Sequence, residues 1–281
     1  MNSPQLIFER RNSASNNFEE NNLPISYEQG KTGNVPTQNL VDAFQTKDGK
    51  DFDWNSGDDP YANRDPRFYR TILCNGDTWM KQTIESYEGG KDGEGTEGAT
   101  KTGYYLKKYM NETVSLDPSK PVTKEHHYIL FRYAEVLLSW AEAENELNGP
   151  SDQVYNYIDQ IRERVGMPKV VRTKYDTQDK LRELIRRERC VEFAGEGLRR
   201  ADILRWKDAG GKMLAETLMS GDLKRITGAI NYSETDPYKR AEVTGTATIE
   251  TRNLAPKNRY LPFSQTDVLD KNPNIKQNPG Y

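Results

Sequence analysis

The most regular part of this 281-residue chain reads YILFRYAEVLLSWAEAENELNGP (residues 128–150) and continues with SDQVYNYIDQIRERVGMP (residues 151–168). In both segments apolar side chains recur in steps of three and four residues, which is the spacing of an amphipathic helix. Each segment ends in a glycine and a proline, at 148–150 and 166–168, and such pairs are typical helix stops. We predict two antiparallel helices joined by a tight turn, with Ser151 as the N-cap of the second helix. This is the form of one tetratricopeptide-type unit.

The helical pattern continues toward the C-terminus. A third helix is expected over residues 177–194, where the sequence again places apolar residues at helical spacing and two glycines end the pattern. A further helix reaches Trp206. Because Trp140 and Trp206 lie within helical patterns, we expect both to be packing residues.

The rest of the chain lacks this regularity. Residues 1–127 are rich in Asn, Gly, Asp, Pro and Tyr, and the polar tract 88–103 is expected to be a mobile loop. Residues 210–256 are also expected to be irregular, with a short helical turn at Ser264, three residues before Asp267. The predicted fold class is therefore mainly α, with tetratricopeptide-like helical pairs, long irregular loops and little β.

The composition excludes some classes of protein. The net charge of −3, with 30% charged residues, provides no basic excess for nucleic acid. The hydrophobic fraction is 34% and the mean hydropathy is −0.94, and we find neither a long apolar run nor an export signal. The abrupt N-terminus suggests a piece of a longer protein. Cys74 and Cys190 could pair, or Cys190 could serve as a small apolar residue on a helix.

No motif predicts catalysis. Glu188 and Glu192 lie four residues apart on one helical face, as a glycosidase acid and nucleophile could. The arginines nearby would lower both pKa values, so we expect a structural charge network instead. They stand at positions 186, 187, 189, 199 and 200. His126 and His127 lack a third metal ligand at suitable spacing and are expected at a solvated helix start.

The loop DGKDFDWNSGDDPYANRDPRFY (48–69) is rich in possible calcium ligands. An EF-hand beginning at Asp51 fails, because Ser56 occupies the glycine position and Ala62 the position of the bidentate glutamate. A looser calcium site remains a weaker alternative, and its candidate ligands are Asp51, Asp53, Asp58 and Asp59. We otherwise expect no cofactor and no metal. The end of the loop, 64–69, is expected to be structural, with Arg64 and Arg67 paired to local carboxylates.

Six stretches, in order along the chain, resemble the C-terminal half of SusD/RagB-family proteins. They are PTQNLVDAF (36–44), DPYANRDPRFY (59–69), TGYYLKKY (102–109), RYAEVLLSWAEAENEL (132–147), RRERCVEFAGEGLRRADILRW (186–206) and NPNIKQNPGY (272–281). One such match would be weak, but six in the same order span nearly the whole chain.

The resemblance implies a surface-exposed lipoprotein of the outer membrane of Bacteroidetes-type bacteria. Such proteins bind glycans and deliver them to a TonB-dependent transporter of the SusC type, and their lipid anchor lies in the N-terminal half, outside this sequence. Residues 1–281 would form the C-terminal domain of such a protein. Within it we expect a loop-rich ligand-binding part (1–127), a helical part (128–206) and an irregular C-terminal wrap (207–281).

The same resemblance directs attention to aromatic residues in loops, because sugars stack on flat rings and hydrogen-bond to polar neighbours. Trp54, between Asp53 and Asn55, is the first candidate, although it could instead pin its own loop to the helical body. The other candidates are Trp79, Tyr87 and Tyr27. A different function also fits the sequence: a scaffold whose helical unit docks on a partner protein and whose loops bind nothing.

Overall fold

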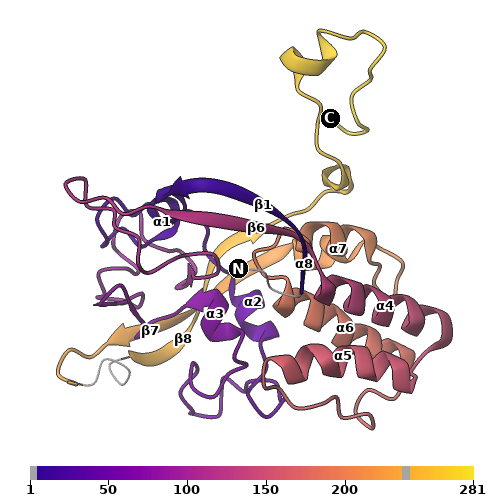
Figure 1. Ribbon diagram of the computed structural model, residues 1–281, viewed down its shortest axis with the longest axis horizontal. Helices are drawn as coiled ribbons and strands as arrows, with labels where there is room; N and C mark the ends of the chain where they lie inside the picture. Colours follow the sequence, from indigo (N-terminus) through magenta and orange to yellow (C-terminus); the bar gives the residue numbers. More distant parts are fainter. Residues whose placement is uncertain (1–4, 236–240) are drawn as a thin grey trace. The chain divides into compact units, whose positions relative to one another are not determined.

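The computed structural model describes residues 5–235 and 241–281 (Figure 1). Contacts divide the chain into two compact units. The first contains residues up to 197 together with 224–247, and the second contains 198–223 and 248–281.

A helical layer of three helices confirms the predicted helix pair and the third helix. They are α4 (Tyr133–Asn148), α5 (Asp152–Arg164) and α6 (Gln178–Glu192), which lie side by side in Figure 1. The Ser151 hydroxyl accepts a hydrogen bond from the Val154 N–H at 3.3 Å and so caps α5. Gly149, with φ of 79°, ends α4 in a conformation that favours glycine. The shared apolar core contains Ala141, Val154, Ile158, Leu181, Leu184 and Ile185.

Helix α4 starts later than the sequence suggested. Residues 124–132 form strand β6 (Lys124–Arg132), which pairs antiparallel with β1 (Leu6–Ser15), and the two strands run together in Figure 1. The apolar run of β6 fits a strand as well as a helix, and a partner 118 residues away along the chain selects the strand. His126 and His127 therefore lie on a strand, within 3.1 Å of Glu19 and Glu9, and not at a helix start.

The expectation of little β was wrong. Strands β7 (Gly221–Ile230) and β8 (Ala241–Arg252) pair in the region expected to be irregular. Their Thr, Ile and Val residues favour strands, but glycine and charged residues between them obscure the alternation. The fold is mixed, with about 30% helix and 20% strand.

The loop-rich part of the first unit holds short elements around its own core. They are α1 (Asn17–Asn22), α2 (Gln38–Ala43), α3 (Phe68–Thr71), β2 (Ile72–Leu73), β3 (Thr78–Trp79), β4 (Gln82–Thr83) and β5 (Tyr105–Leu106). β2 pairs with β5, and β3 pairs with β4. The core includes Leu23, Tyr27, Leu73, Trp79, Ile84 and Tyr105. The long loops of this part therefore pack around a hydrophobic core of their own.

The second unit contains α7 (Arg199–Arg205) and α8 (Leu214–Leu218), which pack around Trp206. A short helical turn at Gln265–Leu269 follows Ser264, as predicted, and the Ser264 hydroxyl accepts a hydrogen bond from the Asp267 N–H at 3.2 Å. Trp206 is buried, but the expectation that Trp140 is a packing residue was wrong, since Trp140 is 58% exposed.

Two further expectations concern the thiols and the membrane. Cys74 and Cys190 are not joined by a disulfide, so they do not pair. Within the two described ranges, no helix has both the length and the apolar character needed to cross a bilayer.

Candidate functional site

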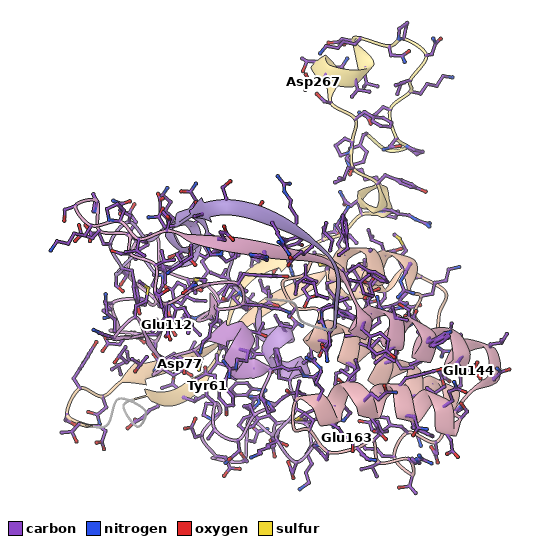
Figure 2. The ribbon with its side chains drawn as sticks, in the orientation of Figure 1. Tyr61, Asp77, Glu112, Glu144, Glu163 and Asp267 are labelled. Carbon is purple, nitrogen blue, oxygen red and sulfur yellow. The ribbon has the colours of Figure 1, made fainter. Side chains whose placement is uncertain are left out.

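The first unit contains a cavity of about 680 Å³, here called the Trp54 cavity. Figure 2 labels Tyr61 and Asp77, two of its side chains. The described residues that line it are Phe52, Trp54, Gly57, Asp58, Asp59, Pro60, Tyr61, Ala62, Tyr69, Cys74, Asn75, Asp77, Tyr87, Glu242 and Val243. Most come from the loop 48–69 quoted above, and the others come from the segment 74–87 and from β8. The wall therefore combines flat aromatic surface with carboxylates and one amide.

Trp54 is held in place by the body of the protein. Its indole N–H donates to Oδ1 of Asp42 on α2 at 2.9 Å, and its ring contacts Phe52 edge-on at a centroid distance of 5.0 Å. The side chain is half-buried. Trp54 thus fixes its own loop and also lines the cavity, so both interpretations of this residue fit the same geometry.

Tyrosines form the second aromatic part of the wall. The hydroxyl of Tyr61 lies 2.8 Å from that of Tyr87 and donates to that of Tyr104 at 3.3 Å. The Tyr69 hydroxyl donates to the Tyr61 carbonyl oxygen at 2.7 Å. Burial raises the pKa of Tyr61 and of Tyr87, so both phenols stay protonated at neutral pH. The rings are therefore neutral, and their mutual hydrogen bonds keep them in position.

The polar part of the wall is acidic. Asp58, Asp59, Asp77 and Glu242 line it, and the Asn75 amide is the neighbouring uncharged group. An oxygen of Asp59 accepts the Tyr61 backbone N–H at 2.9 Å, and one of Asp77 accepts the Cys74 backbone N–H at 3.0 Å. Burial raises the pKa of Asp77, although that hydrogen bond and Lys107 both act to lower it.

The other predicted site residues are dispersed. Trp79 and Tyr27 are 6% and 4% exposed, and the Tyr27 hydroxyl donates to the Trp79 carbonyl oxygen at 2.7 Å, so both rings are part of the core. Tyr87 is also buried, but it reaches the cavity wall. Asp53 and Asn55 are exposed and do not line the cavity; an oxygen of Asp53 accepts the Asn55 backbone N–H in a local turn. Of the six residues predicted to bind glycan, the structure brings Trp54 and Tyr87 to this cavity, which Asp58 and Asp59 of the candidate calcium site also line.

The loose calcium site is not supported by the geometry. Asp51 forms an ion pair with Arg187 and accepts a hydrogen bond from Gln45. Across residues 5–235 and 241–281, no group of three or more His, Cys, Asp or Glu side chains is arranged to hold a metal ion.

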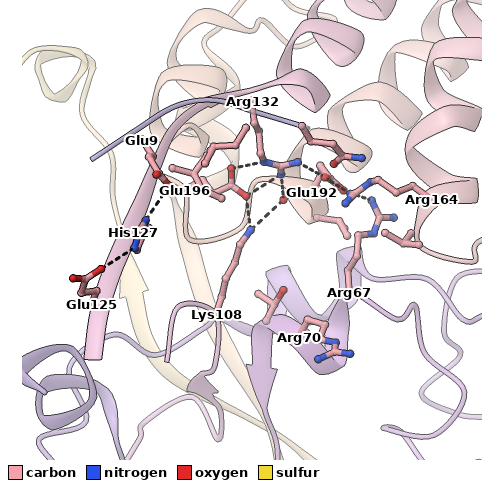
Figure 3. Close-up of a pocket in the computed structure, with 16 residues that line it drawn as sticks. Glu9, Arg67, Arg70, Lys108, Glu125, His127, Arg132, Arg164, Glu192 and Glu196 are labelled. Carbon is pink, nitrogen blue, oxygen red and sulfur yellow. Dashed lines mark hydrogen bonds and ion pairs between the residues drawn. The ribbon is translucent and has the colours of Figure 1, made fainter. Parts of the chain in front are cut away.

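A second cavity of the first unit, about 660 Å³, has a different character (Figure 3). We call it the charged cavity. The charged side chains among its lining residues are Arg67, Arg70, Lys108, Arg132, Arg164, Glu9, Glu125, Glu192 and Glu196. Most of them pair with one another: Arg132 donates to Glu192 at 2.5 Å and to Glu196 at 2.8 Å, and Lys108 donates to Glu196 at 2.5 Å.

Glu192 is the centre of these ion pairs. Oxygens of this buried carboxylate accept from Arg132 and Arg164 at 2.5 Å and from Arg67 at 3.2 Å. Burial alone would raise the pKa of Glu192, but the three guanidinium groups together lower it to about 2. The side chain therefore carries a negative charge throughout the physiological range and is unsuited to be a general acid.

Glu188 completes the same network. Arg67 donates to it at 2.9 Å, and Arg162 forms a second ion pair with it. The predicted structural network is present, and its arginines include residues of β6, α5 and the loop 64–69, which are distant from Glu188 and Glu192 in sequence. Arg67 also pairs with Asp65, as expected, whereas Arg64 donates to the carbonyl oxygens of Val41 and Phe44 and not to a carboxylate.

Sequence reasoning missed other residues of the wall, among them Tyr61, Asn75, Asp77 and Glu242. Asn75 and Asp77 stand in a turn sequence, CNGDT, that is common in loops and carries no ligand signal. Glu242 lies on β8, more than 180 residues from Trp54 in sequence. Only the tertiary structure brings these residues to one wall.

The fold is similar to crystal structures of SusD-like proteins. One, a SusD-like protein from Bacteroides fragilis, has a TM-score of 0.76 and 26% identity, and the match covers 100% of this chain and 55% of that one. A second B. fragilis structure, described as a SusD-like carbohydrate binding protein, has a TM-score of 0.73 and 26% identity, with 97% and 54% covered. The chain thus spans about half the length of these relatives.

The sequence comparison agrees with the fold. The profile of the SusD family matches residues 5–281, and the chain belongs to the SusD family. SusD-like protein P25 of Formosa agariphila is 39% identical over 106 residues, which is 36% of this chain and 19% of that protein. SusD-like protein P2 of the same organism is 41% identical over 86 residues, 29% of this chain and 17% of that protein.

Proposed function

We propose that this chain is the C-terminal part of a cell-surface glycan-binding protein and that the Trp54 cavity is its binding site. The observation that carries the proposal is the wall itself, where the half-buried Trp54 ring lies beside carboxylates and the Asn75 amide. A sugar offers C–H faces to a ring and hydroxyls to acceptors and amides, and sites for such ligands combine apolar surface with a few placed polar groups. The neighbouring Asp53 and Asn55 would contact a longer ligand outside the cavity.

Binding by one such site should be weak. If the values for aromatic pairs transfer to sugars, each stacking ring contributes about 0.5–1.5 kcal/mol beyond the burial of area. Retention of a polysaccharide would then depend on several contacts along the polymer, which act at a high effective concentration.

The whole protein, by this proposal, is an outer-membrane lipoprotein that delivers glycan to a TonB-dependent transporter of the SusC type. Membership of the SusD family supports the proposal, as does the carbohydrate binding by which one B. fragilis structure is described. Residues 1–127 would supply most of the ligand-binding part, since apart from Glu242 and Val243 the wall of the Trp54 cavity comes from that range.

The chain binds without catalysis, by the same proposal. Glu188 and Glu192, the one carboxylate pair with helical spacing that suggested a glycosidase, are both bound by arginines. A retaining glycosidase needs one carboxylic acid that is protonated near neutral pH. The low pKa of Glu192 opposes that role.

The test is a titration of intrinsic tryptophan fluorescence with a panel of soluble polysaccharides: pullulan, xyloglucan, galactomannan and mixed-linkage β-glucan. The 281-residue chain is compared with Trp54→Ala and with Trp140→Ala, a matched loss of an exposed tryptophan on α4. We expect a saturable change with at least one polymer, lost in Trp54→Ala and kept in Trp140→Ala. Equal saturation in both variants would contradict the assignment of the site.

A protein-interaction scaffold remains the second candidate, because one face of α4 is apolar and exposed. Tyr133, Trp140 and Leu147, spaced seven residues apart, are 45%, 58% and 79% exposed, and Trp140 stacks on Tyr157 at 5.4 Å. Exposed apolar stripes of this kind pack against partner helices. A scaffold would lose its partner on Leu147→Asp and be indifferent to Trp54→Ala, whereas a glycan binder should show the reverse.

A further inference from the structure

The charged side chains that line the Trp54 cavity, among the described residues, are all acidic. Its ionisable acids are Asp58, Asp59, Asp77 and Glu242, and no lysine or arginine is among the described residues that line it. None of these four carboxylates forms an ion pair with another residue of the described ranges. This differs from the charged cavity, where Glu192 and Glu196 are paired with arginines.

Three cations among the described residues lie near side chains of the cavity wall. The Arg64 guanidinium lies 4.8 Å from the Phe52 ring centroid and donates to the backbone carbonyl oxygens of Pro60, Val41 and Phe44. Lys107 lies 5.4 Å from the centre of the Trp79 ring and acts on Asp77 at longer range. Arg225 is paired with Glu94. Among the described residues, the charged groups that line the cavity are thus carboxylates.

Charges of one sign act strongly in such a place. Low-dielectric aromatic walls concentrate the field of the carboxylates in the cavity. A second negative charge about 4 Å from one of them is repelled by an energy that corresponds to at least about fivefold in affinity in water and to more where water is excluded. Hydroxyls and amines, in contrast, can donate to the same oxygens.

We infer that the Trp54 cavity selects glycans by charge: it takes sugar units that are uncharged or carry an amino group, and it rejects units that carry a carboxylate or sulfate. Asp58 and Glu242 are the specificity-determining residues to test, because Asp59 and Asp77 also hold backbone N–H groups of the wall. This inference rests on the proposed function of the cavity.

The test compares polymers that share a backbone. Each neutral polysaccharide of the fluorescence panel is titrated beside its C6-carboxylated derivative, in which primary hydroxyls have been oxidised to carboxylates. We expect the carboxylated polymer to bind at least about tenfold more weakly at low salt, with a smaller difference at high salt because ions screen the repulsion. The double variant Asp58→Asn/Glu242→Gln should reduce the difference to about threefold or less, since two of the four repelling charges are gone.

The control is Glu97→Gln, which removes one exposed charge outside the cavity wall and should leave the tenfold difference in place. Equal affinity for neutral and carboxylated polymers, or an unchanged difference in the double variant, would overturn the charge selection while the Trp54-dependent binding stands. If no polymer of either kind saturates, the proposed function itself fails and the inference fails with it.

Discussion

The two cavities of the first unit differ in chemistry far more than in size. They measure about 680 and 660 Å³. In the charged cavity, buried carboxylates meet arginines and a lysine, and the hydrogen-bonding capacity of Glu192 is taken up by three guanidinium groups. In the Trp54 cavity, carboxylates stand beside aromatic rings and no described lining residue is a cation. Cavity volume alone would not distinguish these sites.

The difference indicates that the charged cavity contributes to stability and that the Trp54 cavity is suited to bind a ligand. A buried charge that has its partners already is costly to disturb, and it has little left to offer a ligand. A half-buried ring beside carboxylates that form no ion pair with a described residue still offers a ligand both apolar surface and hydrogen-bond acceptors. Substitutions should therefore affect stability at the charged cavity and affinity at the Trp54 cavity.

The largest effect on stability is expected for Glu192→Ala. Removal of this carboxylate leaves Arg132, Arg67 and Arg164 short of their partner in a buried site, which should lower the free energy of unfolding by about 3–5 kcal/mol. Urea denaturation followed by circular dichroism measures the change. Glu97→Ala, an exposed control, should change it by less than about 0.5 kcal/mol. A loss at Glu192 no larger than that of the control would show that the network is not structural.

Acid should act through the same carboxylate. The pKa of Glu192 is lowered from its ordinary 4.5 to about 2, so its contribution is complete above about pH 5 and is lost as the pH falls toward 2. The shift corresponds to about 3 kcal/mol of stability at neutral pH. Urea midpoints measured from pH 6 to pH 2.5 should fall more steeply for the wild type than for Glu192→Gln. Parallel curves would contradict the low pKa.

A smaller loss of stability, with a loss of binding, is expected for Gly228→Ala on β7. A Cβ at this position would lie 2.3 Å from the Tyr87 ring and 2.8 Å from the Glu242 carbonyl oxygen, so the ring or the strand must shift. Overpacking of this kind costs about 1–3 kcal/mol. Gly210→Ala, where the nearest atom is 3.3 Å away at an oxygen of Asp208, is the control. Thermal unfolding and the polymer titration measure the two effects, and an unchanged melting temperature would mean that Tyr87 moves freely.

The smallest effect on stability is expected at the acids of the Trp54 cavity. Asp58→Asn changes a carboxylate that has no ion pair with a described residue, so the free energy of unfolding should change by less than about 0.5 kcal/mol. The same urea measurement as for Glu192→Ala tests this. A decrease of more than about 1 kcal/mol in the free energy of unfolding would show that Asp58 stabilises the fold, and it would contradict the proposed difference between the two cavities.

The helices were readable from the sequence because their signals are local. The predicted second and third helices match α5 and α6 closely, since Ser151 and Thr177 cap them and the apolar spacing is regular. The sequence of strand β6 predicts the start of a helix, because an apolar run such as YILFRY fits either structure until its partner β1 is known. β7 and β8 were missed for the same reason, since their pairing is set between segments and not within one.

The site was predictable only in part. Trp54 could be predicted as a candidate ligand-binding residue because no helical or strand pattern around it would bury its ring. The structure places it in the cavity wall. Trp79 and Tyr27 had the same appearance in sequence, yet the core of the loop-rich part buries them. Whether a loop aromatic faces solvent depends on contacts with distant segments, and so does the meeting of Asp77 and Glu242 at one wall.

The central claim is that ligand binds at the Trp54 cavity and not at the charged cavity. Hydrogen–deuterium exchange, measured with and without a saturating neutral polysaccharide from the panel, reports on both sites in one experiment. We expect slower exchange in peptides that cover residues 52–62 and 74–87, and unchanged exchange over 124–132 and 186–197. Slower exchange confined to 124–132 and 186–197 would contradict the claim and assign binding to the charged cavity.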